Sequence, residues 1–185
     1  WAVIKGEKET GVTTFFLKHQ IDTGDLLLQR KLKIGPDETA GEVHDRMMHL
    51  GAEVVLESVQ AIERGDYVLH PQDESKVSKA PKIFRETCEI DFEQPVEEVH
   101  NFIRGLSPYP TAWTTLDGAQ LKIFRAKMEK AEHKHKPGSL LSDGKSYLKF
   151  AAKGGFLSVE ELQLQGRRRM SVKDFLNGFD IPGQD

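Results

Sequence analysis

The sequence predicts an α/β segment followed by a small β-barrel of the OB type, with a linker between them. The front half alternates strand-like and helix-like patterns, whereas the stretch from His70 to Glu93 has no sustained apolar period. The rear half holds short β-patterned runs separated by Asp-Gly and Gly-Gly turns, and this spacing is typical of small barrels that bind polynucleotides. We therefore expect two unequal modules.

The length and composition set the class of protein. A chain of 185 residues suffices for one domain or two small ones. It has no apolar run of membrane length and no charged-then-apolar start, so we expect neither a spanning helix nor a secretory signal. The single Cys88 fits a reducing compartment, which predicts a cytoplasmic protein. The chain starts at Trp1 within a patterned segment, so we expect it to be part of a longer protein.

The first elements form a strand, a turn and a second strand. Residues 12–17 are β-branched and aromatic, and residues 26–34 pass from continuous to alternating apolar character after the turn at residues 22–25. This arrangement predicts a hairpin, or two strands that cross at a loop.

A long amphipathic helix follows the second strand. Thr39 and Glu42 have the spacing of a capping box, and Gly65 marks the end of the pattern. The apolar residues between them recur at steps of three and four: Val43, Met47, Leu50, Val54, Val55, Val59 and Ile62.

The rear half begins with a second helix near Pro95, which ends abruptly at residues 107–110. Strands are predicted at residues 111–116, 121–128, 146–152 and 156–165, and Ser171 is expected to cap a final short helix. Residues 129–136 are predicted to be a solvated loop.

The loop Asp22-Thr23-Gly24-Asp25 is a candidate catalytic site. Two carboxylates and a glycine lie where a strand ends, and ligands in open α/β sheets bind outside such ends. An aspartate there can orient a histidine and set its protonation. The spacing alone favours an Asp-rich turn whose carboxylates are solvated.

Basic residues concentrate in the rear half. The net charge is -3 for the whole chain, and counting by halves gives -6 for residues 1–94 and +3 for residues 95–185. Clustered cations could bind a phosphate backbone or could simply form a solvated edge. The cations on or beside predicted strands are Lys122, Arg125, Lys127, Lys130, Lys145, Lys149, Lys153 and Arg167-Arg168-Arg169. Tyr109 and Trp113 could stack on bases or anchor the core.

Other chemistry has little support in the sequence. No Gly-rich phosphate loop or nucleophile elbow is present. The histidines do not have the spacing of metal ligands, so no metal site is expected.

Several segments resemble the methionyl-tRNA formyltransferase family. The front half carries Glu9-Thr10-Gly11-Val12-Thr13-Thr14 and Ile21-Asp22-Thr23-Gly24-Asp25-Leu26, elements shared with other enzymes that use 10-formyltetrahydrofolate. The similarity continues through residues 72–75, 90–92, 104–113 and 166–171, with Ser107 where asparagine is commoner. The segments of the rear half point to the tRNA enzymes.

The resemblance implies a fold and an activity. Residues 1–72 would be the C-terminal part of a Rossmann-like formyltransferase domain, residues 73–89 a linker, and residues 90–185 an OB-like tRNA-binding domain. The family moves a formyl group from 10-formyltetrahydrofolate to the amino group of methionyl initiator tRNA. An asparagine and a protonated histidine stabilise the oxyanion, and an aspartate, matched here by Asp22, holds the histidine and a proton-relay water. The asparagine and histidine would precede Trp1, so we expect the 185-residue polypeptide alone to be inactive.

The resemblance and the distribution of basic residues together predict binding residues and partners. Ile21, Thr23 and Gly24 are expected to contact the folate cosubstrate. The residues expected to contact nucleic acid are Lys79, Lys82, Arg104, Lys122, Arg125, Arg167, Arg168 and Arg169. The expected partners are initiator methionyl-tRNA and the folate, without a membrane or a metal, and the protein is expected to be a monomer.

The sequence is also compatible with other functions. One is a related enzyme that formylates a sugar nucleotide, or the hydrolase domain of formyltetrahydrofolate dehydrogenase. Another is a non-catalytic RNA-binding OB module whose front half is a docking platform.

Overall fold

The structure, a computed structural model, describes residues 1–73, 75, 77–179 and 181. Glu74 and Lys76 of the expected linker therefore lie outside the described residues. The chain divides into two compact units, the first made of Trp1–Gly6, Asp37–Gly41 and Lys82–Asp185, and the second of Glu7–Pro36 and Glu42–Pro81. The domain boundaries expected from the sequence remain a prediction.

The second unit is built on an antiparallel hairpin. Strand β1 (Glu9–Phe15) pairs with strand β2 (Leu26–Lys33), with Glu9 opposite Lys33 and an irregularity between Thr14 and Phe15. The hairpin interpretation is thus confirmed. The two strands approach closely at Gly11, where an added Cβ would lie 2.4 Å from the Arg30 carbonyl oxygen, so glycine is required there.

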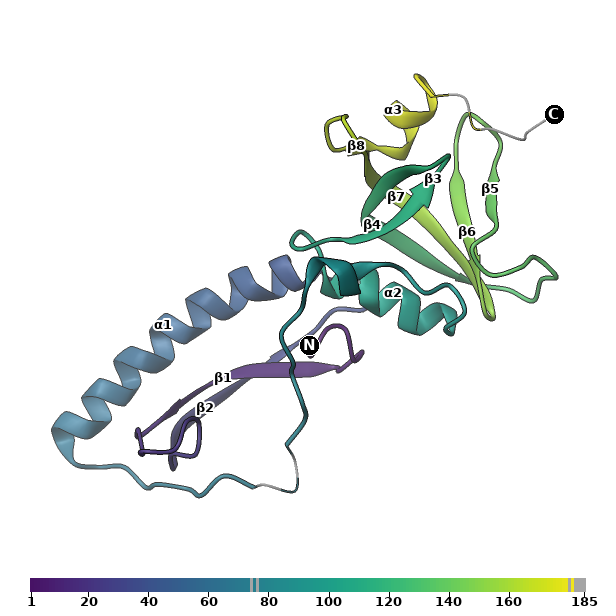
Figure 1. Cartoon of the computed structure of the whole chain (residues 1–185). Helices are drawn as coiled ribbons and strands as arrows, with labels where there is room; N and C mark the ends of the chain where they lie inside the picture. Colours follow the sequence, from purple (N-terminus) through teal and green to yellow (C-terminus); the bar gives the residue numbers. More distant parts are fainter. Residues whose placement is uncertain (74, 76, 180, 182–185) are drawn as a thin grey trace. The chain divides into compact units, whose positions relative to one another are not determined.

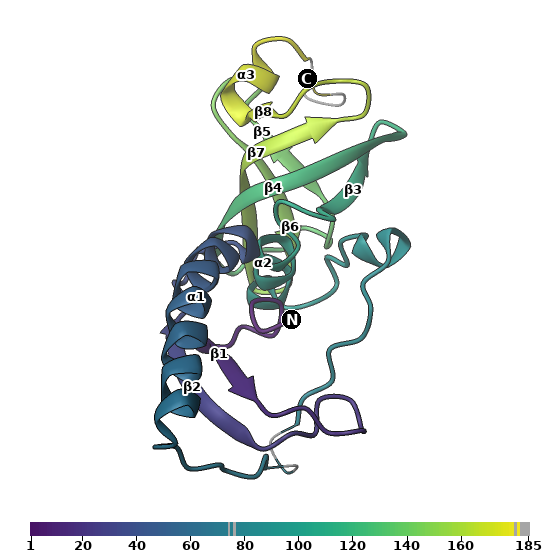
Figure 2. The same ribbon diagram turned by 90° about the vertical axis from the view of Figure 1, so that its left-hand side faces the viewer.

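Helix α1 (Ala40–Arg64) has the bounds that the periodicity and Gly65 predict, and its first two residues belong to the first unit. It lies alongside the hairpin in Figures 1 and 2. The residues buried on it are Val43, Val54, Ser58 and Ala61. A second set of large apolar side chains on the helix is exposed: Met48, Val55, Leu56, Val59 and Ile62.

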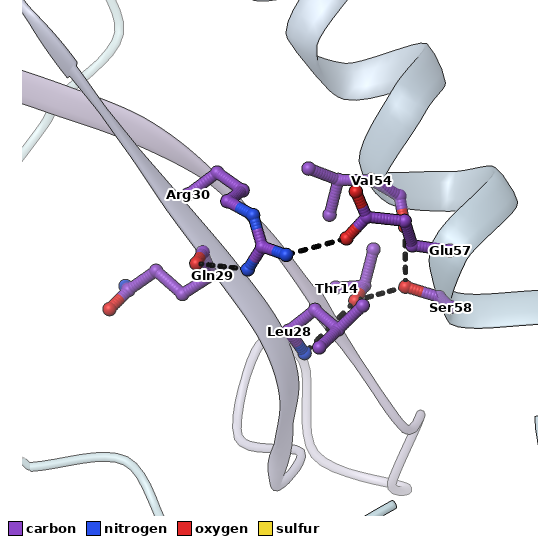
Figure 3. Close-up of polar contacts among 7 residues, drawn as sticks. All are labelled: Thr14, Leu28, Gln29, Arg30, Val54, Glu57 and Ser58. Atoms are coloured by element: carbon purple, nitrogen blue, oxygen red, sulfur yellow. Dashed lines mark hydrogen bonds and ion pairs between the residues drawn. The ribbon is translucent and has the colours of Figure 1, made fainter. Parts of the chain in front are cut away.

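A polar contact joins helix and hairpin, as Figure 3 shows. The Ser58 hydroxyl donates to the Val54 carbonyl at 2.7 Å and lies 2.8 Å from the Thr14 hydroxyl. The Leu28 N–H donates to the Thr14 hydroxyl at 3.2 Å. These bonds form one chain from β2 through β1 to the helix, in which every hydroxyl both donates and accepts.

The first unit is a curled antiparallel sheet with helix α2 (Val96–Gly105) against it. Its strands are β3 (Ala112–Leu116), β4 (Ala119–Lys130), β5 (Leu140–Ser142), β6 (Leu148–Ala152), β7 (Gly155–Leu164) and β8 (Met170–Ser171). They follow the order β3-β4-β7-β6-β5, with β8 paired to β7. Within the part of the chain that the structure describes, no pairing joins β3 to β5, so a closed OB-like barrel remains a prediction.

One core holds this unit together. It contains Val96, Val99 and Ile103 from α2, apolar residues from β3, β4, β6 and β7, and Phe175 from helix α3 (Val172–Leu176). Cys88, in a short 3-10 helix at Arg85–Cys88, is also buried in it. Part of the expected linker is therefore core structure.

The turn signal at Asp117-Gly118 and the cap signal at Ser171 are confirmed. Asp117 and Gly118 both have positive φ in the β3–β4 turn, the backbone that Asp-Gly favours in a two-residue hairpin loop. The Ser171 hydroxyl accepts from the Asp174 N–H at the start of α3.

The solvated loop predicted at residues 129–136 is wrong in part. Glu129 and Lys130 complete β4, because their backbones pair with Phe156 and Gly155 of β7. Beyond the strand, His133 Nε2–H donates to the carbonyls of Ala152 and Gly155, both at 2.9 Å. Strand β5 was not predicted, because three residues are too short to show alternation.

No helix among the described residues is long and apolar enough to cross a membrane.

Candidate functional site

The Asp22 loop joins β1 to β2. The Phe16 N–H donates to the Asp25 carbonyl at 3.1 Å and closes the loop at its base. Asp22 has a φ of 56°, a left-handed conformation that non-glycine residues adopt rarely, and its side chain is exposed. The structure therefore presents this carboxylate to solvent on a sharply turned backbone.

The two carboxylates of the loop differ in their surroundings. Asp25 forms an ion pair with Lys18 at 2.9 Å. No hydrogen-bond or ion-pair partner of the Asp22 carboxylate is found among residues 1–73, 75, 77–179 and 181. Asp22 is thus the carboxylate left available to a ligand or to a further residue.

The expected folate residues take two different positions in this loop. Ile21 is 86% exposed, and the Thr23 hydroxyl donates to the Gln20 carbonyl at 3.0 Å. Gly24 is buried, and an added Cβ would lie 1.7 Å from the Phe16 carbonyl oxygen. Gly24 can therefore offer only its backbone.

Residues distant in the sequence support the loop. Leu26 and His70 exchange two backbone hydrogen bonds, at 2.7 and 3.0 Å. Just beyond, Gln72 Nε2 donates to the carbonyls of Asp22 and Gly24, at 2.8 and 2.9 Å. From the sequence, Gln72 could be placed only at the exit to the linker, since no local pattern signals a bond between residues so far apart in the chain.

The arginine triplet lies after β7 and before β8. The guanidinium of Arg169 lies 4.2 Å from the centre of the Phe124 ring and is paired with Glu161. Arg167 lies over the Phe179 ring at 5.6 Å. Arg168 is exposed, and its side chain has no polar partner among the described residues. Arg168 is therefore the member most available to a phosphate.

The other expected nucleic-acid residues are dispersed. Lys122 and Arg125 are half-buried on β4, opposite Gln163 and Glu161 of β7. Lys82 is exposed above the Phe84 ring at 5.3 Å, and Lys79 is exposed in the second unit. The structure therefore does not gather all these residues on one unit.

Acidic side chains pair with many of the cations that the sequence clusters in the rear half. Four of these lysines form ion pairs: Lys127 with Glu160, Lys130 with Glu97, Lys149 with Glu129 and Lys153 with Glu93. The surface is thus of mixed charge, which sequence counting by halves could not show.

Arg104 lies in the interior. Its side chain is buried, with its guanidinium donating to the Asn101 side chain at 2.9 Å and to the Glu38 carbonyl at 3.0 Å. Burial argues against the expected contact with nucleic acid. His100 lies beside it, buried, with its Nε2 3.4 Å from an Asp37 carboxylate oxygen. Sequence reasoning missed this cluster.

The aromatic candidates also differ. Tyr109 is 87% exposed, whereas the half-buried Trp113 donates its indole N–H to the Arg85 carbonyl at 3.0 Å. Of the two, Tyr109 is the side chain free to stack on a base. The described residues contain no group of three or more His, Cys, Asp or Glu arranged to hold a metal ion.

Comparison with known proteins shows which family models and relatives match this chain. Residues 82–180 match the family described as "Formyl transferase, C-terminal domain", and residues 1–59 match the family "Formyl transferase". The chain is 49% identical to the methionyl-tRNA formyltransferase of Parabacteroides distasonis, over 97% of the chain and 58% of that protein. It is 45% identical to that of Chlorobium chlorochromatii, over 100% of the chain and 59% of that protein.

A solved structure resembles the chain as well. It is HypX from Aquifex aeolicus in complex with tetrahydrofolic acid, with a TM-score of 0.69 and 25% identity, over 95% of this chain and 31% of HypX. The chain spans somewhat more than half the length of the curated relatives above. With its C-terminal module matched over residues 82–180 and its front half over residues 1–59, the chain belongs to the formyltransferase family.

Proposed function

We propose that this chain is part of a methionyl-tRNA formyltransferase, which transfers a formyl group from 10-formyltetrahydrofolate to the amino group of methionyl initiator tRNA. The 49% identity to the Parabacteroides distasonis enzyme, over 97% of the chain, carries the proposal. The complex of the similar HypX with tetrahydrofolic acid supports a folate as the formyl donor.

The proposed catalytic group is Asp22. Its carboxylate is exposed at the tip of the loop and is not engaged by the described residues, unlike that of Asp25. In the proposed reaction the carboxylate holds a histidine in the protonation state that stabilises the oxyanion, and it orients a proton-relay water. Ile21, Thr23 and the Gly24 backbone are the proposed folate contacts.

We propose that the two halves of the chain have different roles. Residues 1–72 belong to the catalytic domain and residues 73–89 to a connector. Residues 90–185 form an OB-like module that binds tRNA, through Lys122, Arg125 and the arginine triplet, with Lys79 and Lys82 from the connector. We further propose a cytoplasmic monomer that needs no metal.

The direct test is formyl transfer by the complete gene product and its Asp22→Asn variant. We expect the variant to lose about a hundredfold or more in rate, with little change in tRNA affinity, because the carboxylate acts on the reacting groups and not on phosphates. Asp25→Asn is the matched control, since Asp25 lies in the same loop and is paired with Lys18. Full activity of Asp22→Asn beside an inactive Asp25→Asn would assign catalysis to the other carboxylate.

The same assay separates the alternatives by acceptor. Wild-type protein is supplied with 10-formyltetrahydrofolate and either methionyl initiator tRNA, a nucleotide-linked amino sugar, or no acceptor. We expect formylation of the tRNA alone. Formylation of the amino sugar, or folate hydrolysis without an acceptor, would instead support a related enzyme.

A further inference from the structure

Gln72 makes contacts that its place in the sequence does not suggest. Its amide nitrogen carries two hydrogens, and the structure aims them at two carbonyls of one loop, those of Asp22 and Gly24, at 2.8 and 2.9 Å. These carbonyls belong to the residues immediately before and after Thr23. One side chain therefore holds the backbone on both sides of Thr23.

The segment that carries Gln72 is itself anchored. Two backbone hydrogen bonds between Leu26 and His70 hold it at the first residue of β2. Gln72 lies two residues beyond this anchor, so its amide reaches the loop from a fixed position. This anchoring reduces the conformational entropy lost when the bonds form.

The loop needs such support at Asp22. Its φ of 56° is a conformation that costs free energy in an L-residue, and strained residues persist where the surroundings hold them. The other contacts of the loop tie its base and flanks, through Phe16 with Asp25, Lys18 with Asp25, and Thr23 with Gln20. Among the hydrogen bonds of the described residues, only that of Gln72 holds the Asp22 carbonyl.

We propose that Gln72 is a positioning residue, whose bidentate bond to the Asp22 and Gly24 carbonyls sets the conformation in which Asp22 acts. The inference rests on the proposed function of Asp22. A carboxylate that orients a histidine and a water must be held in register with them, and a small displacement of such a group costs a large factor in rate.

The test compares four variants of the complete gene product in formyl transfer to methionyl-tRNA. We expect Gln72→Ala to lower kcat about tenfold or more, with KM for the tRNA changed by less than about twofold. Gln29→Ala is the matched control, because Gln29 is an exposed glutamine of the same unit. Among the described residues its side-chain amide bonds only the Thr13 hydroxyl, at 3.2 Å. Asp22→Asn supplies the reference for loss of the catalytic group.

Gln72→Glu gives a readout that general instability would not produce. At neutral pH its carboxylate has no hydrogen to donate to the two carbonyls, whereas its protonated form can donate one. The two carbonyl oxygens disfavour an ionised glutamate at this position and raise its pKa above the ordinary value of about 4.3. The rate of Gln72→Glu relative to wild type should therefore rise as the pH is lowered from about 8 to about 5.5, while that of Gln72→Ala stays level. A kcat for Gln72→Ala equal to that of Gln29→Ala, or a level ratio for Gln72→Glu, would overturn the proposal.

A second readout does not depend on activity. Amide hydrogen exchange of residues 16–25 should be faster in Gln72→Ala than in wild type and unchanged in Gln29→Ala. If wild type formylates no tRNA, the proposed function fails and exchange alone decides whether Gln72 holds the loop. If Asp22→Asn is fully active while Gln72→Ala is inactive, the two hydrogen bonds of Gln72 position a group other than Asp22. That result would refute the proposed role of Gln72.

Discussion

His100 is a buried titratable residue whose surroundings favour its neutral form. Burial lowers the pKa of His100, the nearby Arg104 guanidinium lowers it too, and the Asp37 carboxylate and the Ala126 carbonyl raise it against this trend. The net effect is a folded-state pKa below the ordinary value. Two further charged groups interact electrostatically with this cluster: Glu38 with Arg104, and Lys127 with Asp37.

This lowered pKa predicts a pH-dependent stability. Between the folded-state pKa and about 6.5, the unfolded chain binds more protons than the folded one, so the free energy of unfolding rises with pH. The contribution is complete above about pH 6.5 and is lost as the pH falls through the folded-state pKa. We expect the melting temperature of His100→Gln to fall less steeply than that of wild type between about pH 7.5 and 5.

Thermal melts at several pH values check this expectation. His49→Gln is the matched control, because His49 is exposed on α1. Parallel curves for wild type and His100→Gln would show that the buried imidazole does not contribute to the pH dependence.

Residue-scale roles were the hardest to predict from the sequence. The Asp22 loop could be singled out, since two carboxylates and a glycine after a strand form a local pattern. The contacts of Gln72, the burial of Arg104 and the pairing of Lys149 with Glu129 could not, because each joins residues far apart in the chain. Residue type alone does not indicate which surface cations have acidic neighbours.

At the scale of elements, the contact between α1 and the hairpin rests on a buried polar chain. Ser58 is 5% exposed, and its hydroxyl is linked to that of Thr14. We expect a double-mutant cycle of Ser58→Ala and Thr14→Val to give a coupling of about 0.5–1.5 kcal/mol, measured by urea unfolding. Either single change leaves the other hydroxyl without this bond, so the two single costs should add to more than the cost of the double change.

The Arg30–Glu57 pair is the control for this cycle, because it joins the same helix to the same hairpin at the surface. The Arg30 Nη2 and Glu57 Oε2 atoms are 2.6 Å apart, and both side chains are 47% exposed. Solvent screens such pairs, so we expect a coupling of only about 0.2–1 kcal/mol. A stronger coupling for Arg30 and Glu57 than for Thr14 and Ser58 would contradict this expectation, because the exposed ion pair would then contribute more than the hydroxyl pair.

Elements with strong local signals were predicted well. The bounds of α1 follow from its periodicity and the glycine after it, and the β3–β4 turn follows from Asp117-Gly118. Strand β4 extended further than predicted because its last residues, Glu129 and Lys130, are charged and are strand only through pairing with β7. Tertiary pairing overrides such a polar local sequence.

At the scale of the whole molecule, the proposed tRNA surface predicts salt-dependent binding. Removing one cation that neutralises a phosphate should lower the slope of log affinity against log salt by about 0.7 to 0.9. We expect replacement of Arg167, Arg168 and Arg169 by alanine to weaken initiator tRNA binding and reduce the slope. Among the three, Arg168→Ala should account for much of the effect, because Arg169 is paired with Glu161 and Arg167 lies over Phe179.

Filter binding at several salt concentrations measures this slope. Lys127→Ala is a suitable control, since Lys127 is exposed on the same sheet and paired with Glu160 at 2.8 Å. If the triple variant keeps the wild-type affinity and slope, the arginines are ordinary surface and the tRNA is bound elsewhere.

The strand order of the first unit also bears on how quickly the protein folds. Pairs β3–β4, β5–β6, β6–β7 and β7–β8 join neighbours in the sequence and close short loops. The pairing of β4 with β7 must instead close a loop that includes residues 131–154. Loop closure costs entropy before the contacts compensate for it, and non-local pairing slows folding. We therefore expect the local hairpins to form early and the union of β4 with β7 to limit the folding rate.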